Sequence, residues 1–131
     1  MSAQQLADRA LLNLGRGLQQ SGYRFITPTP LTHDRVYARL ATPLAMNLRD
    51  VFGWSMPFDR DLLPDALREE LQHADVVEEH DSLWRSAVRW SSLDDLLIAH
   101  SAYPTTQADA VFFGPDSYRF AQLIDAHLQQ R

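Results

Sequence analysis

The chain has 131 residues, of which 45% are hydrophobic and 22% are charged, a composition typical of one folded domain. It contains no cysteine, which excludes a disulfide framework, a thiolate nucleophile and a cysteine-ligated zinc site. All 12 basic residues are arginine, so Schiff-base chemistry and a Walker-type phosphate loop, which need lysine, are excluded. The formal net charge of −5 disfavours non-specific nucleic-acid binding. Without a long apolar run or a leader-like N-terminus, we expect a cytoplasmic protein that does not contact membranes.

The first predicted element is a helix over residues 3–20. Ser2 and Gln5 have the spacing of a capping box, in which each side chain satisfies a backbone N–H of the first turn. Apolar residues then recur every fourth position and define the face expected to be buried. They are Leu6, Ala10, Leu14 and Leu18, with Leu11 beside them. Gly22 stands where a left-handed residue commonly ends a helix.

Shorter helices are predicted after an extended segment at residues 23–27. Thr32 is the expected N-cap of the first, and Thr42 followed by Pro43 has the pattern of a second helix start that ends at Gly53. A third helix is predicted from Asp59–Asp61 to about Ala74. The residues expected to face the core from these helices are Val36, Tyr37, Leu40, Leu44, Leu48, Val51, Phe52, Leu63, Leu67 and Leu71.

The pattern then changes to that of strands. Residues 83–90 alternate, which predicts a strand with Trp84 and Trp90 inside and with Arg85 and Arg89 on an outer charged face. The pair Asp94-Asp95 predicts a turn into another strand at Leu96–His100. After a loop, an apolar segment at residues 110–113 is broken by Gly114, and Asp116 or Ser117 is expected to cap a last helix, which no residue closes before Arg131.

This order predicts an α+β fold, mostly helical with a small antiparallel sheet, in a winged-helix-like arrangement. The recognition helix of such a fold would be the one that ends near Ala74. Because Asp65, Glu69 and Glu70 outnumber Arg68 there, that helix has the wrong charge for a phosphate backbone. The arginines of the predicted strand remain a possible contact for RNA.

Most candidate catalytic patterns have a simpler structural interpretation. The five histidines lack metal-ligand spacing, and we expect them to be solvated or hydrogen-bonded. Gly53-Trp54-Ser55-Met56-Pro57 begins like a nucleophile elbow but has proline in place of the second glycine, which indicates a helix-terminating turn. The neighbouring carboxylates Asp94-Asp95 and Glu69-Glu70 are expected to be solvated. The turn Gly114-Pro115-Asp116-Ser117 before the last helix is harder to dismiss, because an open helix start can form the rim of an anion or ligand site.

Three segments carry a family resemblance: Leu48–Ser55, His100–Thr106 and Asp109–Phe120. They resemble the N-terminal region of bacterial class I S-adenosylmethionine-dependent methyltransferases, the small-domain enzymes related to the glutamine methylases of release factors. The similarity covers most of the chain, and its best segment is Val111–Phe120. It implies that Gly114, Pro115, Asp116 and Ser117 lie near the cofactor site of the intact enzyme.

The chain departs from that family in one respect. The family has a strand, a glycine-rich loop for the methyl donor and an Asn-Pro-Pro-aromatic motif after this region, and none of them is present here. The one closely spaced glycine pair, Gly15-x-Gly17, falls inside the first predicted helix. The resemblance therefore implies that residues 1–131 are an accessory domain that recognises substrate and precedes a Rossmann-like catalytic domain.

Such a domain alone is expected to have no catalytic residue, to hold no metal and to bind no S-adenosylmethionine, the cofactor of the intact enzyme. Its expected partners are its own catalytic domain and a protein or RNA methyl acceptor. Two alternatives stay open: a free-standing protein-interaction module, for example a homodimer, and a nucleic-acid-binding winged helix. The reading frame beyond Arg131 and salt-dependent binding to RNA or DNA distinguish the three.

Overall fold

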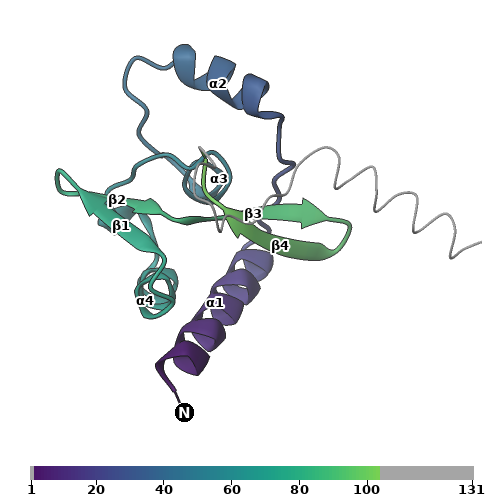
Figure 1. Ribbon diagram of the computed structural model, residues 1–131, viewed down its shortest axis with the longest axis vertical. Coiled ribbons are helices and arrows are strands. Elements are labelled where there is room, and N and C mark those ends of the chain that lie inside the picture. Colours follow the sequence, from purple (N-terminus) through teal and green to yellow (C-terminus); the bar gives the residue numbers. More distant parts are fainter. Residues whose placement is uncertain (1, 104–131) are drawn as a thin grey trace, which may run out of the picture.

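The computed structural model describes residues 2–103, and the α+β class predicted from the sequence is confirmed there. Helices come first and antiparallel strands follow (Figure 1). The helices are α1 (Ala3–Gln20), α2 (Pro30–Ala38), α3 (Leu48–Phe52), the 3₁₀ helix η1 (Arg60–Leu62) and α4 (Asp65–His73). The strands are β1 (Val77–His80), β2 (Leu83–Ser86), β3 (Val88–Leu93) and β4 (Leu96–Ser101).

Helix α1 begins and ends where its sequence signals predict. The Ser2 hydroxyl accepts from the Gln5 N–H at 3.1 Å, and the Gln5 side chain accepts from the Ser2 N–H at 2.8 Å. At the other end Gly22 has a φ of +81°, and the next residue, Tyr23, donates its N–H to the Leu18 carbonyl at 3.1 Å. Of the predicted inner face, Ala10, Leu14 and Leu18 are buried, whereas Leu6 is 54% exposed and that part of the prediction is wrong.

The predicted starts of the next helices are wrong by several residues. Thr29, not Thr32, caps α2, because Pro30 supplies a preset φ at the first helical position. Asn47, not Thr42, caps α3, and its side chain accepts from the Asp50 N–H at 2.9 Å. The helix predicted over residues 59–74 is interrupted at Pro64, the N-cap of α4. The burial of Leu63, Leu67 and Leu71 is confirmed.

The strands form two antiparallel hairpins. In β1–β2, Val77 pairs with Ser86, and both turn residues, Asp81 and Ser82, have positive φ, the geometry of a tight two-residue turn. In β3–β4, Val88 pairs with Ser101 across the predicted Asp94-Asp95 turn. Two non-helical residues bond to these hairpins. Phe58 forms an isolated antiparallel bridge with Trp84 of β2. The Phe25 carbonyl accepts from the Ser92 N–H of β3 at 2.7 Å, and the Phe25 N–H donates to Ser92 Oγ at 3.0 Å.

The continuous strand predicted over residues 83–90 is wrong, because the chain bends between β2 and β3. The Ser86 hydroxyl donates to the Val88 carbonyl at 2.6 Å and accepts from the Val88 N–H at 3.1 Å, a local bonding pattern that replaces ladder bonds. The bend resets the inside–outside alternation. Trp84 and Trp90 are buried as predicted, but Arg89, expected on an outer face, is only 6% exposed.

The strands separate two groups of helices (Figure 1). Helices α1 and α4 pack against each other on one side, and α2 lies on the other side, with α3 packed against β2 and β3. The large core side chains come from α1, α3, α4, β2, β3 and the segments between them: Leu14, Leu18, Phe25, Phe52, Phe58, Leu71, Trp84 and Trp90. None of the helices in the described part of the chain has the length and hydropathy needed to cross a bilayer.

Candidate functional site

Two of the segments that carry the family resemblance meet at Tyr103. The Tyr103 N–H donates to the hydroxyl of Ser55, in the turn after α3, at 3.1 Å. The Tyr103 ring stacks on His33 of α2, with ring centroids 3.8 Å apart and planes 9° from parallel. We call His33, Tyr37, Trp54, Ser55 and Tyr103 the Tyr103 cluster. It joins α2, the turn after α3 and the chain that leaves β4.

A single backbone carbonyl organises the cluster. The carbonyl of Trp54 accepts from the Tyr37 hydroxyl at 2.5 Å and lies 2.9 Å from His33 Nε2. Because a carbonyl can only accept, Nε2 carries the proton of the His33 ring. Nδ1 is then the basic nitrogen, and it is buried without a hydrogen-bond partner among the described residues.

Burial controls the protonation of these two rings. The pKa of His33 is lowered to about 4, mainly by burial and to a smaller extent by the charges of Arg89 and Arg85, against the raising effects of the Trp54 hydrogen bond and of Asp34. Burial raises the pKa of Tyr37 to about 12. Both groups are therefore neutral at neutral pH. An imidazole with so low a pKa is a weak base, so the cluster is suited to packing and positioning rather than to proton transfer.

Two arginines hold the backbone around the cluster. Arg85 Nε donates to the carbonyl of Ser55 at 2.9 Å, and Ser55 has a φ of 58°, an uncommon conformation for serine. Arg89 Nε donates to the carbonyl of Ser101 at 2.8 Å, two residues before Tyr103. Burial and the nearby charge of Arg85 lower the pKa of Arg89 to about 10, so it stays charged. The two guanidinium groups fix the turn after α3 and the end of β4.

A serine–histidine pair lies nearby. Ser91 Oγ is 2.6 Å from His100 Nε2, and Thr27 Oγ1 forms a further hydrogen bond with Ser91 Oγ. The spacing is that of a nucleophile and its base. However, Ser91 is fully buried and His100 is 2% exposed, and burial followed by the charge of Arg89 lowers the pKa of His100 to about 3. We interpret this chain of hydrogen bonds as structural, and it matches the expectation of a hydrogen-bonded histidine.

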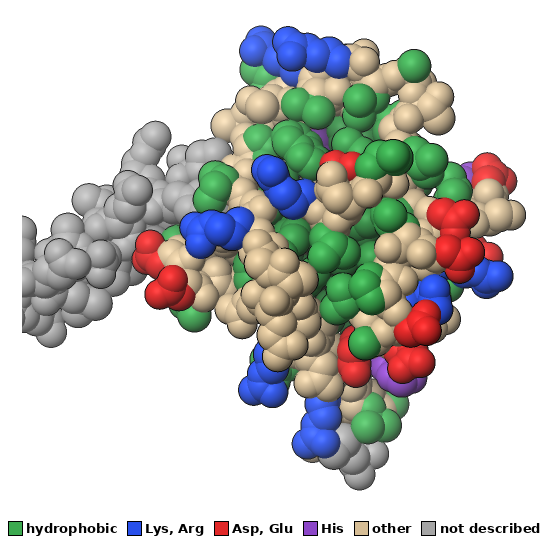
Figure 2. All heavy atoms as spheres, turned by 180° about the vertical axis from the view of Figure 1, so that it is seen from behind, with side chains coloured by type: hydrophobic (Ala, Val, Ile, Leu, Met, Phe, Trp, Pro, Cys, Tyr) green, Lys and Arg blue, Asp and Glu red, His purple; other side chains and the backbone are tan. Residues whose placement is uncertain are grey.

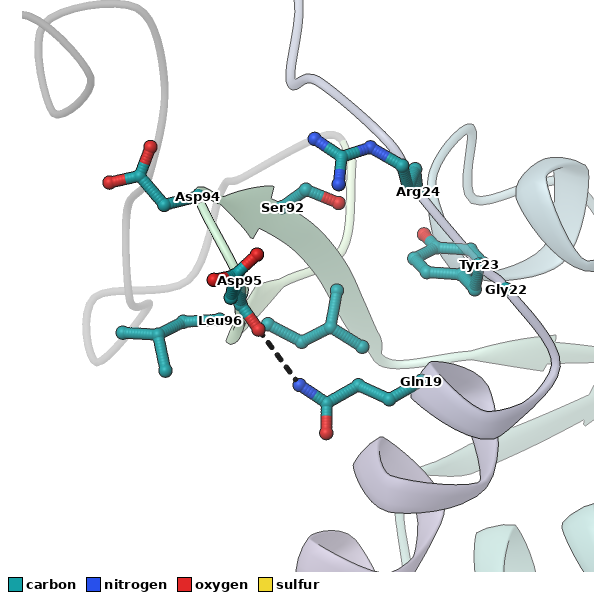
Figure 3. Close-up of a pocket in the computed structure, with 9 residues that line it drawn as sticks. Gln19, Gly22, Tyr23, Arg24, Ser92, Asp94, Asp95 and Leu96 are labelled. Atoms are coloured by element: carbon teal, nitrogen blue, oxygen red, sulfur yellow. Dashed lines mark hydrogen bonds between the residues drawn. The ribbon is translucent and has the colours of Figure 1, made fainter.

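Figure 3 shows a shallow hollow at the turn between β3 and β4. It has a volume of about 330 Å³. Gln19 of α1 donates to the backbone carbonyl of Asp95 at 3.2 Å across it, and Arg24 lines the opposite wall (Figure 3). The carboxylates Asp94 and Asp95, predicted to be solvated, are exposed here. A second hollow shares Arg24 and extends toward α3.

The structure describes some of the site residues predicted from the sequence and not others. Gly114, Pro115, Asp116 and Ser117 lie outside the described residues. The turn at residues 53–57 ends α3, as predicted. The Gly15-x-Gly17 pair lies within α1, as predicted. No group of three or more metal-ligating side chains gathers within residues 2–103.

Sequence reasoning missed the roles of His33 and Tyr37. The one available signal was their spacing of four residues, which places both on one face of α2.

No protein-family model matches the chain, and neither the curated proteins nor the solved structures contain a significant match.

Proposed function

We propose that this chain is the N-terminal substrate-recognition domain of a cytoplasmic class I S-adenosylmethionine-dependent methyltransferase, and that a catalytic domain follows it. The proposal begins from the resemblance of Leu48–Ser55 and His100–Thr106 to that family. One observation carries it furthest: these two segments, far apart in the sequence, meet through the hydrogen bond from the Tyr103 N–H to Ser55 Oγ.

The contact between Tyr103 and Ser55 would be useful in a domain that precedes another domain, because it fixes the chain where it leaves β4. The chain leaves β4 at Ser101, and Ala102 donates its N–H to the Ala87 carbonyl at 3.1 Å. Tyr103 is then fixed by Ser55 and by the His33 ring. Because the backbone is held on three successive residues, whatever follows starts from a defined position and direction. In the proposed enzyme this positions the substrate-binding surface of the domain relative to the methyl donor.

The proposed role is to bind and orient the methyl acceptor, while the catalytic domain binds the cofactor. The predicted turn Gly114–Ser117 lies ten to fifteen residues after the Tyr103 cluster along the chain. In the proposed enzyme this turn approaches the cofactor, and residues 104–113 connect it to the cluster. No step of the methyl transfer is assigned to residues 2–103.

Substitution of the anchor tests the role. In the complete product of the gene, Tyr103→Ala should raise KM for the methyl acceptor about tenfold or more, because loss of a fixed orientation weakens productive binding. The affinity for S-adenosylmethionine should stay unchanged. The assay follows transfer of a labelled methyl group to protein and RNA fractions of the source cell, with Arg9→Gln on the exposed face of α1 as the control.

Two results would contradict the proposed role. One is acceptor methylation by Tyr103→Ala that is indistinguishable from wild type while unfolding data show the cluster disrupted. The other is a gene product that transfers no methyl group and binds no S-adenosylmethionine, which would favour the free-standing interaction module.

A further inference from the structure

A second hollow lies between the end of α1 and the start of α3. It has a volume of about 460 Å³. We call it the arginine hollow, because Arg24 and Arg49 both line it and no carboxylate does. Its remaining walls come from residues 21–23 and from Asn47 and Leu48.

The backbone on both sides of Arg24 is fixed by hydrogen bonds, and the Arg24 side chain is exposed. Residues 23–27 alternate between buried and exposed, so Arg24 points outward between two buried aromatic neighbours. On one side the Tyr23 hydroxyl donates to the Trp90 carbonyl at 2.6 Å, and on the other the Phe25 N–H donates to Ser92 Oγ at 3.0 Å. A ligand therefore meets an arginine whose main chain is already ordered, which lowers the entropic cost of binding.

Arg49 is held from the opposite wall. It lies in α3, whose residues Val51 and Phe52 are fully buried, and its guanidinium lies 5.9 Å from the centroid of the Phe25 ring. The carboxylate of its neighbour Asp50 accepts from the Met46 N–H at 2.9 Å. In the described part of the chain, neither Arg24 nor Arg49 is within ion-pair distance of a carboxylate, whereas Arg68 and Arg85 are.

Two arginines that line one hollow without a carboxylate beside them favour the binding of an oxyanion. A guanidinium binds carboxylate or phosphate through paired, charge-assisted hydrogen bonds. The floor beside them is open: a side chain added at Gly22 would meet no atom within 4 Å. An anionic group that enters the hollow beside Gly22 therefore displaces no side chain there.

The surroundings favour a protein segment over a nucleic acid. The hollow of Figure 3, which shares Arg24, carries Asp94 and Asp95 on its other side, so a polyphosphate chain that continued past Arg24 would meet like charge. On the α3 side, Leu44 and Met46 are 44% and 75% exposed. Figure 2 shows one whole face of the molecule, on which hydrophobic side chains gather over the centre and both basic and acidic groups lie among and around them.

We propose that the arginine hollow binds an acidic segment of a partner protein, with one of its carboxylates held between Arg24 and Arg49. An apolar residue next to that carboxylate then packs on Leu48 and on the exposed Met46. The proposal is independent of the methyltransferase role, since it concerns binding by residues that the structure describes whatever follows them.

The test uses the complete chain and a fluorescent peptide of alternating glutamate and leucine. We expect saturable binding that weakens with added salt and that falls about tenfold with Arg24→Gln and again with Arg49→Gln. Arg9→Gln, which removes the same charge from an exposed site on α1, should leave the affinity within about twofold. The backbone amides of residues 22–24 and 47–49 should shift in NMR spectra on addition of the peptide.

Each of the following binding results contradicts the proposal. Equal loss of binding in Arg9→Gln would indicate non-specific attraction to net charge. No binding at millimolar peptide, or equal binding of the glutamine counterpart of the peptide, would remove the carboxylate site. Tighter binding of a single-stranded RNA oligonucleotide, lost with Arg24→Gln, would replace the acidic protein segment with a phosphate ligand. Unchanged urea midpoints for both arginine variants show that loss of binding is not loss of fold.

Discussion

His33 and His100 are buried imidazoles whose pKa values, about 4 and about 3, lie below the ordinary value of 6.5. In the unfolded chain both take up a proton near pH 6.5, whereas in the folded chain both stay neutral to lower pH. Between these limits the unfolded state binds more protons, so the free energy of unfolding rises with pH. The stabilisation is fully present above about pH 6.5 and is lost as the pH falls.

Urea unfolding between pH 7 and pH 5 measures this effect. The free energy of unfolding should fall by about 2 kcal/mol for each buried histidine over that range, which lies above most carboxylate pKa values. His33→Gln should remove about half of the pH dependence, because glutamine can still donate to the Trp54 carbonyl but does not titrate. His73→Gln, at an exposed position, should leave it unchanged. A free energy that does not change between pH 7 and pH 5 would show that neither imidazole is buried.

Arg85 and Arg89 differ in burial despite their similar place in the sequence pattern. Arg89→Ala should destabilise the protein by about 2–3 kcal/mol, since it leaves a void and removes the donor to the Ser101 carbonyl. Arg85→Ala should cost about 1 kcal/mol, less than Arg89→Ala, because the Arg85 side chain is partly exposed, so that water can replace its hydrogen bond to the Ser55 carbonyl, and because its ion pair with Glu78 is long at 3.9 Å. Chemical denaturation measures the free energy of unfolding of both variants. Equal small losses in the two would support the outer charged face predicted from the sequence.

Two glycines of α1, Gly15 and Gly17, differ in what a side chain at their position would contact. A Cβ atom at Gly15 would come within 2.7 Å of the Trp90 ring, which is held in the core. A Cβ at Gly17 would meet only the end of the Leu67 side chain, also at 2.7 Å, which can rotate away.

These two glycines form a matched pair for a stability measurement. Gly15→Ala should destabilise by about 1–3 kcal/mol through overpacking, although alanine favours a helix. Gly17→Ala should be neutral or stabilising by up to about 1 kcal/mol, because the gain in helix propensity outweighs a rotamer change. Thermal unfolding distinguishes them, and a Gly15→Ala variant as stable as Gly17→Ala would contradict the packing of α1 against β3.

Elements with strong local signals were predictable from the sequence. Helix α1 has a capping box and a closing glycine, and the Asp94-Asp95 turn defines the β3–β4 hairpin. The start of α2 was misplaced because Thr29 and Thr32 are both competent caps, and their ranking depends on the proline at position 30. The split between β2 and β3 depends on the Ser86 hydroxyl, and serine alone does not predict a bend.

At the scale of the whole molecule, the candidate site was largely unpredictable. His33, Trp54 and Tyr103 lie in separate parts of the chain, and their contact follows from the packing of α2 over the turn after α3. Arg24 and Arg49 are likewise far apart in the sequence and line the same hollow. No local pattern encodes such contacts. The segments named in the resemblance to methyltransferases include Trp54–Ser55 and Tyr103, which are in contact, but the resemblance itself stays a prediction and names none of the side chains that join them.

Calorimetry with S-adenosylmethionine tests the proposed place of this domain in an enzyme most directly. The 131-residue chain alone should release or absorb no heat of binding, because the proposed cofactor site lies in a following domain. The complete product of the gene should bind one equivalent. Stoichiometric binding by the 131-residue chain alone, or a gene product that ends at Arg131, would contradict the proposal.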